Sequence, residues 1–161
     1  MSLPKGFTLR PATVADAETI QSHRDALFVE MGETAQRVQA VSDAGLSWLR
    51  GALARQYYQG WLMEQGGAVV AGAGLIWTDM PPNPDTMLSV WAYLLNVYVQ
   101  PSARGLGLSR ALLDVAEAQS RERGVNLLHI HASTQARPLY LQRGYADNRG
   151  MELHVLDLET A

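Results

Sequence analysis

The sequence contains no cysteine among its 161 residues, which excludes disulfide bonds, thiolate metal sites and a cysteine nucleophile. No apolar run approaches the roughly 18 residues that a membrane-spanning helix needs, and no basic segment followed by an apolar one stands near the N-terminus. Charge of one sign is also scarce, because 13 Lys and Arg stand against 16 Asp and Glu, for a net charge of -3. We therefore expect a cytoplasmic protein whose partners include neither nucleic acid nor a membrane.

The composition that remains is that of an ordinary globular protein, with 47% hydrophobic and 18% charged residues. A chain of this length buries about 70% of the surface that it exposes when unfolded, so it can form a core without a metal or a disulfide. We expect a single domain over residues 1–161.

Hydrophobic periodicity, helix caps and turn residues predict an α+β fold. Early antiparallel hairpins, one of them turning at Gly66-Gly67, and one late β-α-β crossover indicate a mixed sheet. The proline-rich segment 80–85 must be a loop. Strands are predicted at 7–10, 61–63, 68–77, 88–99, 125–132 and 151–158, and helices from 13 or 16 to 31, then at 42–58, 108–122 and 135–143.

The most informative stretch is residues 96–110, where a buried strand ends at Pro101 and two glycines lead into a helix. Gly105 and Gly107 allow close approach of a ligand to the backbone N–H groups of the helix start, which attract phosphate. A plain strand-to-helix turn is the alternative. A dinucleotide-binding turn is disfavoured because its third glycine would fall at Arg110, and a P-loop is disfavoured because no Gly-Lys-Ser/Thr follows.

Two motifs resemble those of the GNAT superfamily of N-acetyltransferases. Residues 104–109, RGLGLS, resemble the cofactor motif Q/R-x-x-G-x-G/A, with Ser109 in place of the final small residue. Residues 136–145, ARPLYLQRGY, are similar to the second motif A-x-x-L-Y-x-x-x-G-F. Ser133 stands where the family often has asparagine, and Pro138 is compatible with the short helix only in its first turn.

The resemblance implies a GNAT-like fold, with a mixed, mostly antiparallel central sheet, helices on both faces and one β-α-β crossover. It also implies transfer of an acetyl (acyl) group from acetyl-CoA to a primary amine of a small molecule or peptide, by direct attack in a ternary complex without a metal. A homodimer is expected by analogy. The alternative is a non-catalytic CoA or acyl-CoA sensor, or a protein-interaction module, with the same fold.

The resemblance also implies site residues. Backbone groups of the strand end would pair with the pantetheine arm, amides of the glycine turn would hold the pyrophosphate, and Tyr140 would protonate the leaving sulfur, unless it is a core tyrosine. The cofactor-binding residues are Val97, Tyr98, Val99, Arg104, Gly105, Leu106, Gly107, Leu108, Ser109, Arg110 and Ser133, and the catalytic residue is Tyr140.

The proton acceptor is not assigned by the sequence. The usual family positions hold Tyr93 and Leu95, neither of them an obvious base. His129 and His131 are substitutes if they are not simply hydrogen-bonded in a strand. Glu30 and Glu33 either recognise a cationic amine, or relay a proton, or are solvated. Three aromatic residues are candidates to line an acceptor pocket near the 80–85 loop, namely Trp77, Trp91 and Tyr93, although core packing explains Trp91 equally well.

Overall fold

The structure, a computed structural model, describes residues 3–147 and 151. The chain divides into two compact units, Met1–His131 and Ala132–Ala161, and each is described by itself. A single domain over residues 1–161 stays a prediction. Among the described helices, none has both the length and the apolarity needed to cross a bilayer.

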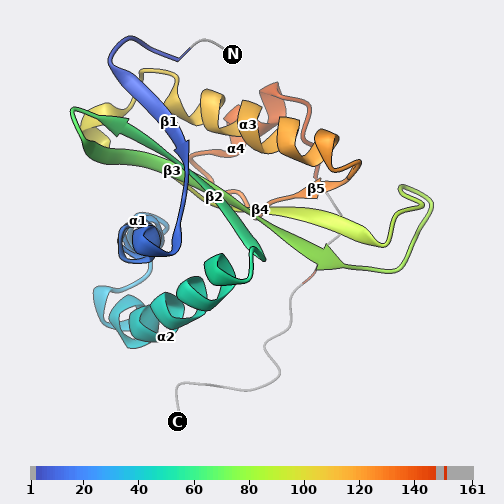
Figure 1. Ribbon diagram of the computed structural model, residues 1–161, viewed down its shortest axis with the longest axis horizontal. Helices are drawn as coiled ribbons and strands as arrows, with labels where there is room; N and C mark the ends of the chain where they lie inside the picture. The colour runs from blue at the N-terminus through green and yellow to red at the C-terminus, as the bar shows by residue number, and fades with distance from the viewer. Residues whose placement is uncertain (1–2, 148–150, 152–161) are drawn as a thin grey trace. The chain divides into compact units, whose positions relative to one another are not determined.

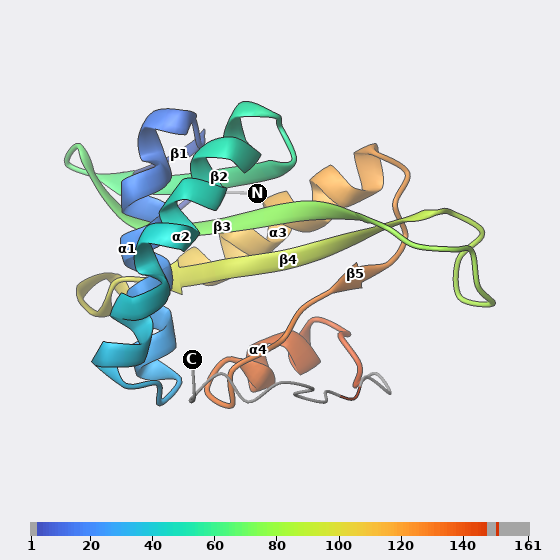
Figure 2. The same ribbon diagram turned by 90° about the horizontal axis from the view of Figure 1, so that it is seen from below.

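The larger unit is built on a five-stranded sheet whose strands follow one another in chain order (Figures 1 and 2). Neighbouring strands are antiparallel, except that the last two are parallel and are joined through a helix. This confirms the α+β class and the mixed, mostly antiparallel sheet with one crossover. The strands are β1 (Phe7–Pro11), β2 (Tyr58–Gln65), β3 (Ala68–Asp79), β4 (Val90–Val99) and β5 (Leu128–His129).

Helices cover both faces of this sheet, as predicted. Figure 1 shows α1 (Ala17–Glu30) and α2 (Ala35–Ala54) on one face and α3 (Leu108–Glu122) on the other. Short 3-10 turns, Val14–Asp16 and Pro101–Ala103, precede α1 and α3. The smaller unit contains α4 (Arg137–Gln142).

Several predicted boundaries were wrong. The helix predicted at 42–58 begins at Ala35, because the Thr34 hydroxyl caps it by accepting from the Arg37 N–H at 3.3 Å, and it ends at Ala54. Strand β2 consequently starts earlier than predicted, at Tyr58. The strand predicted at 125–132 is reduced to two residues, and the one predicted at 151–158 lies outside the described residues except for Met151.

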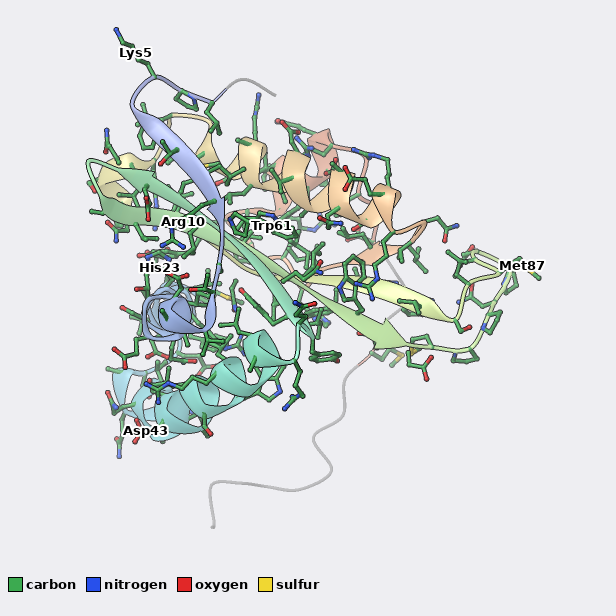
Figure 3. All side chains as sticks on the ribbon, viewed as in Figure 1. Lys5, Arg10, His23, Asp43, Trp61 and Met87 are labelled. Atoms are coloured by element: carbon green, nitrogen blue, oxygen red, sulfur yellow. The ribbon has the colours of Figure 1, made fainter. Side chains whose placement is uncertain are left out.

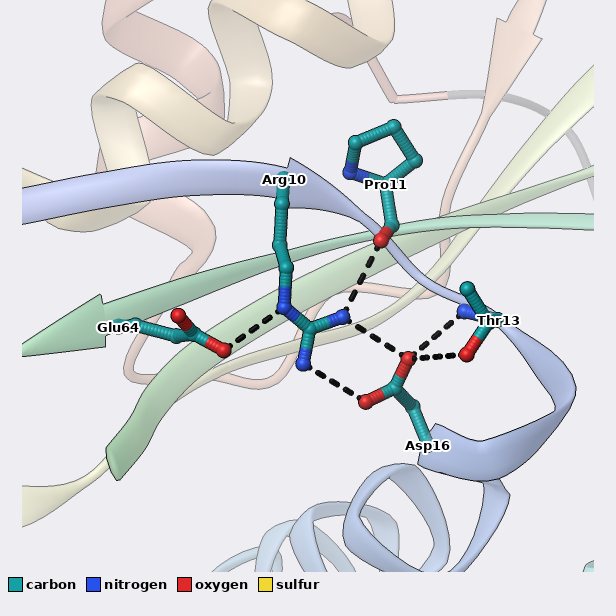
Figure 4. Close-up of polar contacts among 5 residues, drawn as sticks. All are labelled: Arg10, Pro11, Thr13, Asp16 and Glu64. Carbon is teal, nitrogen blue, oxygen red and sulfur yellow. Dashed lines mark hydrogen bonds and ion pairs between the residues drawn. The ribbon is translucent and has the colours of Figure 1, made fainter. Parts of the chain in front are cut away.

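Helix α1 is fixed against the sheet by an arginine of β1 (Figure 4). The Arg10 guanidinium donates to Glu64 of β2 at 2.7 Å and to both carboxylate oxygens of Asp16 at 2.8 and 2.9 Å. Asp16 also accepts from the N–H and hydroxyl of Thr13. The hydrogen bonds from Arg10 lower the pKa of Asp16 to about 2.

An apolar cluster lies between this helical face and the sheet. Its buried members come from α1, α2 and β2, and they are Ala17, Ile20, Leu49, Ala52, Leu53, Tyr58 and Leu62. The cluster holds α1 and α2 over the half of the sheet that contains the end of β4.

The loop between β3 and β4 is not part of this cluster, and Met87 at its tip is 87% exposed (Figure 3).

Candidate active site

Strand β4 contains a β-bulge just before its end. Leu95 is opposite Gly74 and Tyr98 is opposite Gly72, so Ala73 of β3 faces two residues of β4, Asn96 and Val97. Asn96 adopts a left-handed backbone conformation with φ of 56°, which asparagine tolerates better than most residues. The extra residue shifts the alternation of side chains, so Leu95 and Tyr98 both face the side of α1 and α2.

The bulge residue is held by hydrogen bonds on that face. The Asn96 Oδ1 accepts from Arg24 Nη1 of α1 at 2.7 Å, and its Nδ2 donates to the Tyr58 hydroxyl of β2 at 3.2 Å. Tyr58 is buried, and desolvation raises the pKa of its phenol to about 12. Its hydroxyl passes directly over Gly74, where a Cβ would lie only 2.1 Å away. Three elements therefore fix the position of the bulge.

Beyond the bulge, β4 has an open edge. Its pairing with β5 covers only Ala92 and Tyr93, and no other described strand pairs with this side of β4. The Gln100 N–H donates to Val70 of β3 at 2.8 Å. Because successive N–H groups alternate in direction, those of Val97 and Val99 point away from β3. They are placed to bind an extended ligand as an added strand would, whereas the Tyr98 backbone faces β3.

The chain then turns into α3 through the glycine segment. Gly107 is the N-cap of α3, with φ of 81°, and it has no side chain to cap the first N–H groups. Leu108 is buried and anchors the turn, whereas Arg110 is exposed. A Cβ at Gly107 would meet nothing within 4 Å, so the outer side of the turn is open. Backbone N–H groups and the helix dipole make this a fitting place for a phosphate.

Arg104 ties this turn to β4 and α1. Its Nε donates to the Val99 carbonyl at 2.9 Å, and its Nη2 lies 2.6 Å from Glu30 Oε1. Its guanidinium carbon is 5.8 Å from the centre of the Tyr98 ring. Arg104 and Glu30 are thus partners of one another, and both were candidate ligand-binding charges in the sequence.

The candidate aromatic residues are divided between the two faces. Tyr93 is in register with Tyr58 through β3, and its hydroxyl is hydrogen-bonded to His131 Nδ1. Trp91 stacks on His129 with ring centres 4.5 Å apart. Trp77 lies on the opposite face, under the Arg123 guanidinium of α3 at 4.3 Å. The prediction that all three aromatic residues line one pocket was therefore wrong.

The two histidines differ in environment. Burial, followed by the nearby charge of His131, lowers the pKa of His129. His131 is exposed at the end of the larger unit. Among the described side chains, no three of His, Asp or Glu come close enough together to hold a metal ion.

The smaller unit contains the remaining two candidates. Ser133 Oγ accepts from the Ala136 N–H at 3.2 Å just before α4 begins, and Pro138 lies in the first turn, as its compatibility with a helix required. Tyr140 is buried, with its ring edge-on to that of Tyr145 at 5.3 Å. Burial raises the pKa of Tyr140 to about 12, so its hydroxyl stays protonated at neutral pH.

Two residues of the site escaped the sequence analysis, Arg24 and Asn96. The signal for Asn96 was an amide side chain inside an otherwise apolar strand, where a polar group needs partners. Arg24 carried a weaker signal, since it falls between the apolar positions Ile20 and Leu27 of its helix.

Comparisons with known proteins agree on one family. The family model described as acetyltransferase (GNAT) domain matches residues 26–154. A GCN5-related N-acetyltransferase from Ralstonia eutropha JMP134 is 38% identical, covers 93% of this chain and 99% of its own, and superposes with a TM-score of 0.91. The Escherichia coli (strain K12) protein named uncharacterized N-acetyltransferase YjgM is 26% identical over 88% of this chain and 83% of its own length.

A further solved structure is a complex with acetyl-CoA. It is a predicted acetyltransferase with acetyl-CoA from Clostridium acetobutylicum, 23% identical, with a TM-score of 0.86. The match covers 92% of this chain and 96% of that one, and at this identity it shows a shared fold.

Proposed function

This chain belongs to the GNAT superfamily of acetyltransferases, and we propose that it transfers an acetyl group from acetyl-CoA to a primary amine of a small molecule or peptide. The amine attacks the thioester directly while both substrates are bound. The observation that carries the proposal is the bulge at Asn96, which leaves the backbone of Val97 and Val99 open immediately before the glycine turn.

The residues present fit acetyl-CoA as co-substrate. The open edge of β4 supports pairing of the Val97 and Val99 backbone with the amides of the pantetheine arm. The start of α3, with Gly107 at its cap, supports binding of the pyrophosphate. Arg104 contributes by holding the turn to the Val99 carbonyl.

The transfer itself needs a hydrogen-bond donor to the thioester carbonyl, a proton donor to the sulfur and a proton acceptor for the amine. The Val99 N–H, or one close to it, donates to the thioester carbonyl oxygen as negative charge develops there. The amine nitrogen bonds to the carbonyl carbon, the carbon–sulfur bond breaks, and the sulfur takes a proton. Tyr140 donates that proton, and its pKa of about 12 keeps the hydroxyl protonated and able to donate at neutral pH.

The amine must also lose a proton, and we assign its acceptance to His131. Imidazole is the side chain that most often serves as a general base. His131 is hydrogen-bonded to Tyr93, which lies on the same face of the sheet as Asn96. A hydroxyl in this position can pass a proton from the amine to the imidazole.

The test is thiol release from acetyl-CoA with a panel of amines, comparing the unaltered protein with Tyr140→Phe and Gly107→Glu. Tyr57→Phe, at an exposed tyrosine, is the matched control. We expect Tyr140→Phe to lower kcat by about 10-fold or more, as for loss of a general acid. Gly107→Glu should raise the KM for acetyl-CoA, because it adds negative charge beside the proposed pyrophosphate site.

The outcomes distinguish the enzyme from a sensor. Acetyl-CoA binding that depends on Gly107, without thiol release for any amine, would favour the non-catalytic sensor. Absence of binding would refute the assignment of the co-substrate. Because burial raises the pKa of Tyr140 to about 12, deprotonation of its hydroxyl should cause no loss of activity between about pH 7 and pH 10.

A further inference from the structure

Arg24 is a half-buried arginine that forms no hydrogen bond or ion pair with a carboxylate of residues 3–147 or 151. Its Nη1 donates to Asn96 Oδ1, and its guanidinium carbon lies 4.6 Å from the centre of the Phe28 ring. Desolvation lowers its pKa, although not enough to remove the charge of an arginine. A guanidinium withdrawn from water in this way favours an anion as its partner.

Two carboxylates of α1 that lie near Arg24 in the sequence have other hydrogen-bond partners, although the charge of Asp25 still counteracts part of the lowering of the Arg24 pKa. Asp25 accepts from Gln21 at 2.7 Å and from Ser42 at 2.6 Å, which turns its carboxylate toward α2. Glu30 is paired with Arg104. A guanidinium has five N–H donors, and only the bond to Asn96 uses one of them among the described residues. The remaining donors are therefore available to a ligand.

The position of Arg24 connects it to the transfer site. Its partner Asn96 is the residue directly before Val97, at the start of the open edge of β4. The phenol of Tyr93, which contacts His131, lies close enough to Arg24 to counteract part of the lowering of the Arg24 pKa. The guanidinium thus lies beside the segment that would receive both the thioester and the attacking amine.

We propose that Arg24 binds a carboxylate of the acceptor, so that the acceptor is an amino acid or a similarly small amine with a free carboxylate. The inference rests on the proposed function, since it names the substrate class of that site. The planar guanidinium matches a carboxylate with two parallel hydrogen bonds. The same charge repels polycationic acceptors, which makes polyamines poor substrates.

The test uses matched pairs of amines, each amino acid and its uncharged amide, with a polyamine as a third arm and an aminoalkyl phosphonate as a fourth. We expect kcat/KM to be at least about 10-fold higher for the acid than for the amide, through KM. Arg24→Gln should abolish that preference, whereas any change in the KM for acetyl-CoA should be the same with the acid and with the amide as acceptor. Arg50→Gln, at an exposed arginine of α2, is the matched control.

A second variant approaches the same charge without removing Arg24. Asn96→Asp places a protein carboxylate against the guanidinium, and aspartate tolerates the left-handed backbone. It should therefore also abolish the preference for acidic acceptors. This variant keeps the test valid if Arg24→Gln fails to fold.

Several results would overturn the inference while leaving the acetyltransferase intact. The first two are an equal kcat/KM for acid and amide and a higher kcat/KM for the polyamine or the phosphonate. The third is an equal fall of kcat/KM for acid and amide in Arg24→Gln, which would mean that Arg24 only positions the bulge. If no amine supports thiol release, the proposed function fails, and the carboxylate site is then tested by ligand binding instead of by activity. With CoA present, an N-acetyl amino acid should then raise the Tm of the unaltered protein but not of Arg24→Gln, and absence of that shift would refute the carboxylate site.

Discussion

Replacement of Asn96 should reveal how much the bulge depends on a single side chain. Asn96→Gly removes the acceptor of the Arg24 hydrogen bond and the donor to the Tyr58 hydroxyl. Breaking a hydrogen bond to a charged group costs about 1.5 to 3 kcal/mol, and a neutral one about 0.5 to 1.5 kcal/mol. The free energy of unfolding should therefore fall by about 2 to 4.5 kcal/mol.

Asn96→Ala separates the side chain from the backbone. It loses the same hydrogen bonds, but alanine also resists a φ of 56°, where glycine is unstrained. Asn96→Ala should therefore be about 1 kcal/mol less stable than Asn96→Gly, although alanine is normally the more favourable residue in a strand. This order is the signature of the left-handed bulge.

Urea denaturation gives the free energies of unfolding, and titration with acetyl-CoA gives the effect on the open edge. We expect acetyl-CoA affinity to fall in both variants, because the backbone of Val97 and Val99 depends on the bulge. Asn96→Gly as stable as the unaltered protein would refute the hydrogen-bond argument. An alanine variant more stable than the glycine variant would refute the left-handed conformation at this residue.

Two further predictions concern ion pairs, one that fixes α1 to the sheet and one beside the glycine turn. Asp16→Asn should lower the free energy of unfolding by roughly 2 kcal/mol at neutral pH. Because the native pKa of about 2 lies below the ordinary aspartate value, this contribution is present above about pH 4 and is lost as the pH falls toward 2. Thermal melts of both proteins at about pH 7 and about pH 2 check it, and a difference in stability that does not change with pH would contradict it. Arg104→Gln should raise the KM for acetyl-CoA by about 10-fold, since it loses the bond to the Val99 carbonyl. Glu30→Gln, which breaks only a partly exposed ion pair, should change that KM by less than about threefold, and an equal effect of both variants would show that the ion pair matters more than the bond to β4.

Much of the fold followed from local signals in the sequence. The turn at Gly66 and Gly67 was predicted correctly, because both residues have positive φ and glycine favours that conformation. Pro138 correctly limited where α4 can begin. The errors concerned the ends of helices and strands, where capping and strand pairing outweighed the local sequence pattern. Thr34 caps α2, so that this helix begins earlier than predicted, and β5 contains only the two residues that pair with β4.

The candidate site divides in a similar way. The glycine turn before α3 was located from the sequence, because proline and glycine act on the backbone of their own segment. The engagement of Arg104 with Glu30 was not, since 74 residues separate them along the chain. Trp77 was grouped with Trp91 and Tyr93, although the register of β3 and β4 puts it on the opposite face.

By itself, the sequence determined the order of helices and strands, the turn that leads into α3 and the family, since these depend on periodicity and on residues that constrain their own dihedral angles. The tertiary structure alone decided that Asn96 forms a bulge and that Arg24 and Tyr58 hold it. Those contacts depend on the register between β3 and β4 and on the placement of α1. Such long-range geometry is set by packing of the whole unit, and no short stretch of sequence encodes it.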